Sequence, residues 1–295
     1  MNPVFVPNSR NDLDKTSNNV VIFGDKLSTD HPGFNDEKYK IRRKEIATIA
    51  QNYIFGNKIP RIIYDSTENK TWESCLDKLL KLFPNNACKE YYESLNLLFD
   101  NNIYNLYEIP QLQTVSDFLE NRTGWVLRPV KGLLSTRDFI AGFAFKVFYC
   151  TQYIRHSSKP DYTPEPDIIH ELIGHVPMLF NKDFSEFTQT IGKLSLGACD
   201  DLILKIGRLY WYSIEFGLSL DNGIKKAFGA GILSSFGELE YSLSSTCQAK
   251  YVDFEPEIVC EIDYPITKFQ EMYCIIKNFN EATQKIKNFI EIQKY

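Results

Sequence analysis

Two histidines and one glutamate are the residues of this sequence best suited to hold a metal ion. His170 and His175 lie in HELIGH and are half of the four histidines in the chain. Glu215 lies in the stretch RLYWYSIEFGL, whose apolar residues predict a largely buried helix. A carboxylate buried without a cation costs several kcal/mol, so Glu215 is expected to have a cationic partner. That partner is either an arginine or a metal ion held by the two imidazoles.

The five-residue spacing of the two histidines limits the kind of site they can form. On an ideal α-helix, side chains five residues apart point about 140° away from one another. Gly174 and Pro177 therefore predict that the helix ends near Ile173, so that the chain can turn His175 back toward His170. The zinc-peptidase pattern H-E-x-x-H has a four-residue spacing and is disfavoured.

The ligand types do not choose the metal. Two imidazoles and one carboxylate are the ligands of non-haem Fe(II) oxygenases, and zinc hydrolases use the same set. Acidic residues beside the histidines are candidates to orient the imidazoles or to bind a ligand of their own: Glu165, Asp167 and Glu171.

Composition and charge narrow the function classes. The 295 residues are 43% hydrophobic and 24% charged, with a formal net charge of -5, so attraction to nucleic acid or to an anionic membrane is not expected. No apolar run approaches the roughly 18 residues that span a bilayer, and the N-terminus lacks a signal-peptide pattern, which predicts a cytoplasmic protein. The seven scattered cysteines indicate reduced thiols.

The hydrophobic periodicity predicts a mainly α protein with a minor β element. Residues 1–25 are polar and are expected to form a flexible, solvated tail, followed by one domain over residues 26–295. Short strands are expected at Ile62–Tyr64 and Val126–Val130. Helices are expected within 36–55 and over Trp72–Phe83, Ser116–Glu120, Arg137–Tyr153, Phe184–Leu194, Asp200–Phe216 and Thr267–Ile290, with Asp, Ser or Thr as caps near their starts.

Five stretches of the sequence resemble the catalytic domain of the pterin-dependent aromatic amino acid hydroxylases. They are DHPGF at 30–34, RPVKGLLSTRDF at 128–139, CTQYIRHSSKPDYTPEPDIIHELIGHVPM at 150–178, YWYSIEFGL at 210–218 and FGAGILSSFGEL at 228–239. The resemblance covers nearly all of the chain from Asp30 to about residue 290, and it is strongest to the phenylalanine-hydroxylating members. It implies a single helical, basket-like catalytic domain.

The resemblance also implies a metal and a cofactor. Iron(II) would be held by His170, His175 and Glu215, with O2 as co-substrate. Tetrahydrobiopterin, or a related reduced pterin, would bind beside the iron against a glycine-containing turn and an aromatic ring. The matching pterin-binding positions are Gly132, Leu133, Leu134, Ser135, Thr136, Phe139, Glu171 and Tyr210.

A second set of residues is implied to bind the amino acid substrate. The planar guanidinium of Arg155 would bind both oxygens of the substrate carboxylate, a geometry that lysine does not offer. Trp211 and Phe216 would line the pocket for the aromatic ring, although core packing also explains both from the sequence alone. The full set is Arg155, Tyr162, Thr163, Pro166, Asp167, Trp211, Phe216, Gly231 and Ser234.

Five positions bear on which aromatic amino acid is hydroxylated. Leu133 and Trp211 differ from the Tyr and Phe of tryptophan-hydroxylating members, and Tyr162 and Thr163 differ from the His and Ser of tyrosine-hydroxylating members. Ile266 is ambiguous, because tryptophan-hydroxylating members also have Ile there. We therefore expect hydroxylation of L-phenylalanine to L-tyrosine. The alternatives are hydroxylation of tryptophan, alone or as a second activity, and a non-catalytic protein that binds a pterin or an amino acid.

Two positions near the pterin depart from the family pattern. Tyr149 and Gly207 stand where phenylalanine-hydroxylating members usually have His and Ala, so the affinity for pterins is expected to differ. Animal members also carry a regulatory domain and a tetramerisation helix, and the contribution of neither is expected here. The expectation is a monomer or weak dimer that binds a small-molecule substrate and binds neither nucleic acid nor membranes.

Overall fold

Helices make up most of the computed structural model, which describes residues 5–23, 26–161, 163, 165–266 and 268–293. About 52% of the chain is helical and 11% lies in strands, so the prediction of a mainly α fold is confirmed. Among the described residues, no helix has both the length and the apolar character needed to cross a bilayer. The α-helices are α1 (Glu37–Gln51), α2 (Ser66–Asn86), α3 (Lys89–Asp100), α4 (Leu112–Thr123), α5 (Thr136–Ala144), α6 (Lys182–Ser195), α7 (Asp200–Tyr210), α8 (Ala230–Leu233), α9 (Phe236–Leu243), α10 (Pro256–Val259) and α11 (Phe279–Gln293).

Four short helical segments have other windings. Two are 3-10 helices, η1 (Asn11–Lys15) and η3 (Pro177–Phe180). The other two are π-helices, η2 (His170–His175) and η4 (Trp211–Glu215), and together they contain the three candidate metal ligands.

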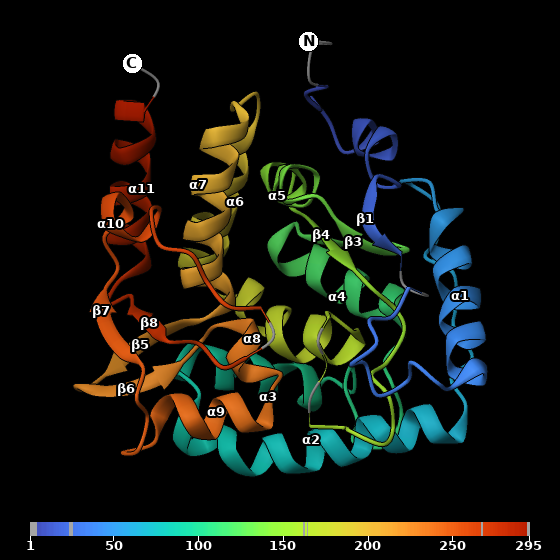
Figure 1. Ribbon diagram of the computed structural model, residues 1–295. Helices are drawn as coiled ribbons and strands as arrows, with labels where there is room; N and C mark the ends of the chain where they lie inside the picture. Colours follow the sequence, from blue (N-terminus) through green and yellow to red (C-terminus); the bar gives the residue numbers. More distant parts are fainter. Residues whose placement is uncertain (1–4, 24–25, 162, 164, 267, 294–295) are drawn as a thin grey trace.

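Three small sheets connect the helices in the described part of the chain. β1 (Val20–Phe23) pairs antiparallel with β3 (Gly132–Leu134), and β2 (Val126–Pro129) pairs parallel with β4 (Val147–Cys150). The third sheet has the order β6–β5–β8–β7 and consists of β5 (Gly217–Asp221), β6 (Ile224–Ala227), β7 (Lys250–Asp253) and β8 (Met272–Ile275). Figure 1 shows this sheet at the lower left, and the two strand pairs on the opposite side near α5.

Side-chain caps begin several helices, as the sequence predicts. The Asp65 side chain accepts hydrogen bonds from the backbone N–H groups of Thr67 and Glu68. The Glu68 side chain in turn accepts from the backbone N–H of Asp65, so the two residues form a capping box at the start of α2. Ser135 caps α5 by accepting from the backbone N–H of Asp138. Because such caps satisfy otherwise unpaired N–H groups, they fix where these helices begin.

The core is built around the π-helix η2. Leu172 and Ile173 are fully buried, and their carbonyl groups accept hydrogen bonds from two buried tyrosine hydroxyls. Tyr104 donates to Leu172 at 2.6 Å and Tyr91, from α3, donates to Ile173 at 2.8 Å. Since unpaired buried carbonyls are costly, these two tyrosines stabilise an irregular winding at the centre of the molecule.

The prediction of a helix over Arg137–Tyr153 is wrong for its second half. Helix α5 ends at Ala144, and Lys146 adopts a positive φ of 56°, which stops the helix. The run Val147–Cys150 then forms β4, in which every residue is buried. A short apolar run that contains a β-branched residue and aromatic residues suits a strand buried on both faces, and the helical pattern before it hid the change of period.

Two further secondary-structure predictions differ from the structure. The helix predicted over Thr267–Ile290 begins only at Phe279, because Met272–Ile275 forms strand β8 between β5 and β7. Residues 62–64 are not in a strand. The strand predicted at Val126–Val130 is confirmed as β2.

The prediction of a flexible tail over residues 1–25 is wrong for residues 5–23. Leu13 in η1 is fully buried, and Asp14 forms an ion pair at 2.5 Å with Arg128, which is 1% exposed. Ser17 accepts a further hydrogen bond from this arginine at 2.8 Å. The polar composition of the segment concealed its role, since these polar residues compensate a buried cation.

Candidate metal centre and surrounding pocket

The π-helical winding of η2 brings His170 and His175 together. The backbone N–H of Val176 bonds to the carbonyl of Glu171 at 3.2 Å, an i→i+5 bond. Because a π-helix rotates less per residue than an α-helix, side chains five residues apart lie on one face, and the Nε2 atoms of the two histidines are 3.0 Å apart. The predicted end of the helix near Ile173 is therefore wrong, although the predicted approach of the two rings is found.

Glu215 reaches both imidazoles from the second π-helix, η4, whose winding is shown by the i→i+5 bond from Phe216 to Trp211. Its carboxylate oxygens lie 3.1 Å from His175 Nε2 and 3.5 Å from His170 Nε2. Burial raises the pKa of Glu215, but the two imidazoles outweigh this effect and hold the pKa well below its usual value. The ligand atoms of the three residues lie within 4.8 Å of one another, so this donor set suits one divalent transition metal ion.

A serine fixes the tautomer of His170. The hydroxyl of Ser234 donates to the carbonyl of Ala230 at 2.8 Å, so it accepts from His170 Nδ1 at 2.9 Å. A proton on Nδ1 leaves the lone pair of Nε2 directed at the candidate metal position. Ser234 was predicted to line the substrate pocket, and the structure adds this contact with a candidate ligand.

Tyr210 contacts Glu215 from the last residue of α7. Its hydroxyl donates to Glu215 Oε1, and both groups are buried. The Tyr210 ring also packs edge-on against Phe139 of α5, with ring centroids 5.6 Å apart. Of the residues predicted to bind the pterin, Tyr210 therefore contacts the candidate metal ligand and Phe139 packs against Tyr210.

Glu171 lies on η2 between the two histidines but is held away from them. Its Oε1 atom accepts from the backbone N–H and from the hydroxyl of Thr151, both at 3.0 Å. Burial raises the pKa of Glu171 to about 7. Its carboxylate is thus fixed to the chain that follows β4, and it is absent from the cluster of three ligands.

The remaining positions predicted for the pterin lie on β3 and the start of α5. Ser135 is the helix cap, Leu134 is buried and Leu133 is exposed. The departure at Gly207 has a physical reason, because a Cβ atom there would lie 2.9 Å from the methyl group of Thr136. Gly207 therefore leaves room for the threonine at this predicted pterin position.

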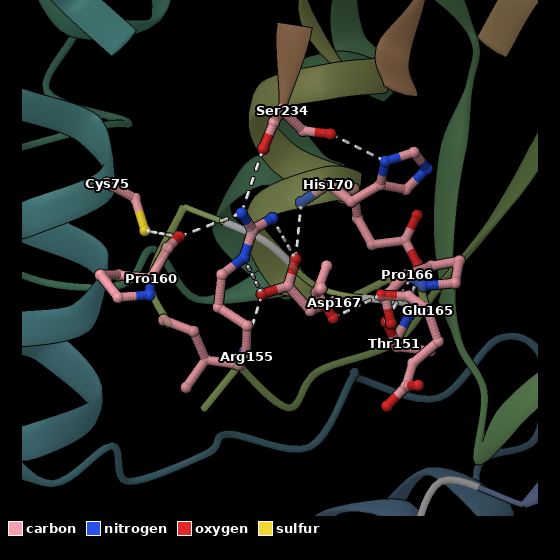
Figure 2. Close-up of polar contacts among 12 residues, drawn as sticks. Cys75, Thr151, Arg155, Pro160, Glu165, Pro166, Asp167, His170 and Ser234 are labelled. Atoms are coloured by element: carbon pink, nitrogen blue, oxygen red, sulfur yellow. Dashed lines mark hydrogen bonds and ion pairs between the residues drawn. The ribbon is translucent and has the colours of Figure 1, made fainter. Parts of the chain in front are cut away.

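Arg155 forms its two-pronged contact with Asp167. Its Nε and Nη2 atoms donate to the two oxygens of this carboxylate, both at 2.9 Å, and Nη1 donates to the carbonyls of Pro160 and Ser234. Both members of the ion pair are buried. Asp167 also accepts from the backbone N–H of His170 at 3.0 Å, and Figure 2 shows it lying between Arg155 and His170. The fork predicted to hold a substrate carboxylate is thus occupied within the chain, and Asp167 links it to the candidate ligand.

Two more predicted substrate residues, Thr163 and Pro166, lie on the chain before η2. The hydroxyl of Thr163 donates to the carbonyl of Glu165, and the carbonyl of Pro166 lies 3.3 Å from the Thr151 hydroxyl, which also contacts Glu171. Tyr162, also predicted to contact the substrate, lies outside the described residues.

Aromatic rings form a group beside the ligands. Trp211 packs against Phe216, with ring centroids 4.8 Å apart, and Gly231 allows close approach because a Cβ atom there would lie 2.5 Å from the Phe216 ring. Sequence reasoning missed Tyr264, which stacks on Trp211 with a centroid distance of 4.1 Å. It also missed Gln270, which accepts from the Trp211 indole at 2.9 Å. No spacing signal could have found either residue, since both lie more than fifty positions from Trp211.

Similarity to known proteins extends over most of the chain. A family model described as biopterin-dependent aromatic amino acid hydroxylase matches residues 4–294. The chain is 50% identical over 283 residues to phenylalanine-4-hydroxylase of Caenorhabditis elegans and 47% identical over 283 residues to tryptophan 5-hydroxylase of Xenopus laevis. Each match covers 96% of this chain, which spans 62% and 58% of the length of these relatives. A solved structure of phenylalanine hydroxylase from Chromobacterium violaceum, with bound iron(III) and 7,8-dihydrobiopterin, is similar with a TM-score of 0.72 and 31% identity, over 78% of this chain and 82% of that one.

Proposed function

Because the chain belongs to the biopterin-dependent aromatic amino acid hydroxylase family, we propose that it is a phenylalanine 4-monooxygenase. It would hydroxylate L-phenylalanine to L-tyrosine with O2 and tetrahydrobiopterin at a non-haem Fe(II) site. The observation that carries this proposal is the buried cluster of His170, His175 and Glu215. The similarity to phenylalanine-4-hydroxylases supports phenylalanine as the substrate.

The three ligands would hold iron and leave other coordination positions open. Iron together with a reduced pterin supplies the O2 chemistry, and the residues of the chain supply orientation. Ser234 holds His170 in the tautomer that presents Nε2, and Tyr210 donates to the carboxylate of Glu215. Both contacts reduce the reorganisation needed when the metal binds.

Residues around the three candidate metal ligands would form the binding sites for the pterin and for the amino acid. The pterin would lie against Phe139 and the backbone of residues 132–136. The substrate ring would pack against Trp211 and Phe216, and these rings would shield the reacting carbon from water. The carboxylate of the substrate would bind the Nη1–Nη2 edge of Arg155, in place of the carbonyls of Pro160 and Ser234 that Nη1 contacts in this structure.

Tryptophan hydroxylation, or activity on both amino acids, is the second candidate function. The specific observations in its favour are the similarity to tryptophan 5-hydroxylase and Ile266, which is 67% exposed on the turn after Tyr264. Cytoplasmic location and a monomeric or weakly dimeric state stay predictions. Size-exclusion chromatography with light scattering tests the second of these.

The test is anaerobic reconstitution with Fe(II), followed by air, tetrahydrobiopterin and one aromatic amino acid per reaction, with the product identified by mass spectrometry. Tyrosine formed from phenylalanine is expected, and it should be lost in His170→Ala and Glu215→Ala. His156→Ala is the matched control, because His156 contacts Ser158 and Asp36 near the surface and is not a ligand.

Each competing function predicts a different result. Product from tryptophan alone would favour the second candidate. Binding of phenylalanine and pterin without product, in protein whose iron content has been verified, would favour a non-catalytic binding protein. Hydrolytic activity that needs neither O2 nor reductant would favour a zinc hydrolase.

A further inference from the structure

One glutamine connects a wall of the aromatic pocket to the turn beside it. Gln270 is 2% exposed, its side-chain oxygen accepts from Trp211 Nε1 at 2.9 Å, and its side-chain nitrogen donates to the carbonyl of Pro265 at 3.1 Å. Trp211 also has ring contacts with Tyr264 and Phe216. The two ring contacts restrict tilting of the indole plane. The hydrogen bond from Nε1 restricts rotation of the indole within that plane.

A buried glutamate fixes the backbone of this glutamine. Glu238, at 5% exposure in α9, accepts from the backbone N–H of Gln270 at 3.0 Å and from the hydroxyl of Tyr273. These two donors compensate the burial of the carboxyl group. Ser234, four residues before Glu238, contacts the candidate iron ligand His170. The segment 234–238 therefore contacts the candidate metal ligand His170 directly, through Ser234. It contacts Trp211 indirectly, because Glu238 binds the backbone of Gln270.

We propose that Gln270 is a positioning residue that sets the shape of the aromatic pocket and, through it, the preference among aromatic amino acids. This inference rests on the proposed function. Rotation of the Trp211 indole would move its edge into or out of the space for the substrate ring, and the bond to Gln270 opposes that rotation. The same side chain holds Pro265, the residue before Ile266, so the indole and the turn that carries Ile266 keep one arrangement.

The effect of Gln270 on the Trp211 indole can be measured directly by NMR, without an activity assay. In protein labelled with 15N-tryptophan, each of Trp72, Trp125 and Trp211 gives one indole N–H resonance, and Trp211→Phe assigns the third. Gln270→Met, which is nearly isosteric and lacks the acceptor, is expected to shift the Trp211 resonance and speed its hydrogen exchange, while the other two resonances stay in place. Gln270→Glu keeps the acceptor for Trp211 Nε1 but loses the donor to Pro265, so protection that survives in this variant is due to the bond with Trp211.

The second measurement is kinetic. It distinguishes a change in substrate positioning, which alters KM for one substrate, from a loss of folded protein, which lowers the rate and leaves KM unchanged. Loss of one hydrogen bond corresponds to about a 3- to 10-fold change in an equilibrium constant, so Gln270→Met is expected to raise the KM for phenylalanine by about that factor. The KM for tetrahydrobiopterin should stay unchanged, and the ratio of tryptophan to phenylalanine turnover should rise. Gln284→Met, on the exposed face of α11, is the control for a glutamine replaced at the surface.

A double-mutant cycle tests the coupling between the two side chains. In a Trp211→Phe background the indole donor is absent, so Gln270→Met should add little to the KM for phenylalanine. Equal effects of Gln270→Met with and without Trp211 would overturn the proposal, and so would an unchanged Trp211 resonance. Absence of product from the unsubstituted protein would instead overturn the proposed function, and the resonance and exchange measurements would still report whether Gln270 holds the indole.

Discussion

Ser234 contributes two different groups to the neighbourhood of the metal centre. Its hydroxyl accepts from His170 Nδ1, and its backbone carbonyl accepts from Arg155 Nη1 at 3.1 Å. Substitution of the side chain removes the first contact and leaves the second, so the two roles can be separated experimentally.

Ser234→Ala is expected to weaken metal binding by about 10- to 100-fold, because the proton on His170 Nδ1 loses its acceptor. Competition between the protein and a chelator for Fe(II), or for Co(II) as a redox-stable substitute, measures the change. Ser245→Ala, at an exposed position, is the control. Equal metal affinity for Ser234→Ala and the unsubstituted protein would show that the serine does not orient the ligand.

Gly207 and Thr136 are expected to behave as a pair. Gly207→Ala places a Cβ atom 2.9 Å from the Thr136 methyl group, which must then move. Overpacking costs about 1 kcal/mol or more, whereas alanine favours helix α7 by about 0.5–1 kcal/mol, so global stability is a poor readout. The KM for tetrahydrobiopterin is the better measure, and we expect it to rise about 3- to 10-fold. Adding Thr136→Ser removes the methyl group and should reverse most of that rise. If the KM stays high in the double variant, the clash with Thr136 is not the cause.

The metal ligands could be predicted from residue types, but most of their supports could not. Two nearby histidines and a carboxylate in an apolar helix are visible in the sequence because the residues are rare or costly where they stand. The contacts of Tyr264, Gln270 and Glu238 join segments far apart in the chain, and ordinary residues make them. Their roles follow from packing alone, which a single sequence does not record.

Both protein segments that carry the ligands are π-helices packed against other backbone. Gly174 in η2 lies so close to α8 that a Cβ atom would meet the carbonyl oxygen of Ala230 at 2.8 Å and its Cβ at 3.0 Å. The close approach of α8 also brings Ser234, at its end, to His170. The glycine is therefore required by the packing of two elements, beyond any freedom it gives to the backbone.

Gly174→Ala is expected to destabilise the protein by about 1–3 kcal/mol, because neither neighbour is a flexible side-chain end that can move aside. Urea unfolding of the metal-free protein measures this effect. Combining it with Ala230→Gly removes one of the two clashes and should restore part of the loss, since the carbonyl oxygen stays in place. Full stability of Gly174→Ala alone would mean that α8 can shift freely.

Periodicity predicted the helices better than it predicted the strands. The helices α1, α2, α6 and α7 have long amphipathic patterns, the first three also have side-chain caps, and each was expected near its observed position. Strands β4 and β8 are only four residues long and lie directly before or after helical sequence. In such short apolar runs, pairing with a distant strand decides the conformation, and local pattern does not.

At the scale of the whole molecule, the N-terminal segment is part of the folded unit. It contributes an apolar side chain to a small core that includes Val126 and Tyr149, and β1 extends β3, the strand predicted to contact the pterin. Asp14 of this segment neutralises Arg128, and Ser17 accepts a hydrogen bond from it. Its polar composition was a poor guide because a few residues make nearly all of these contacts.

Leu13→Ala is expected to lower the free energy of unfolding by about 2–5 kcal/mol, the usual cost of emptying a fully buried leucine site. Chemical denaturation monitored by tryptophan fluorescence measures it. Val21→Ala is the matched control in the same segment, because this valine is 64% exposed and its truncation should change stability by less than about 0.5 kcal/mol. A similarly small effect for both would describe a detached tail.

The π-helical winding of HELIGH makes the metal centre sensitive to the number of residues between the histidines. A π-helical turn holds more residues than a turn of α-helix, and such turns recur at functional sites. The hydroxyls of Tyr91 and Tyr104 offer the carbonyls of this turn the partners that stabilise it. Deleting one residue between the histidines would give them the four-residue spacing of peptidase-like zinc sites. A change in length of one residue, with every ligand type kept, would thus change how the two imidazoles face one another.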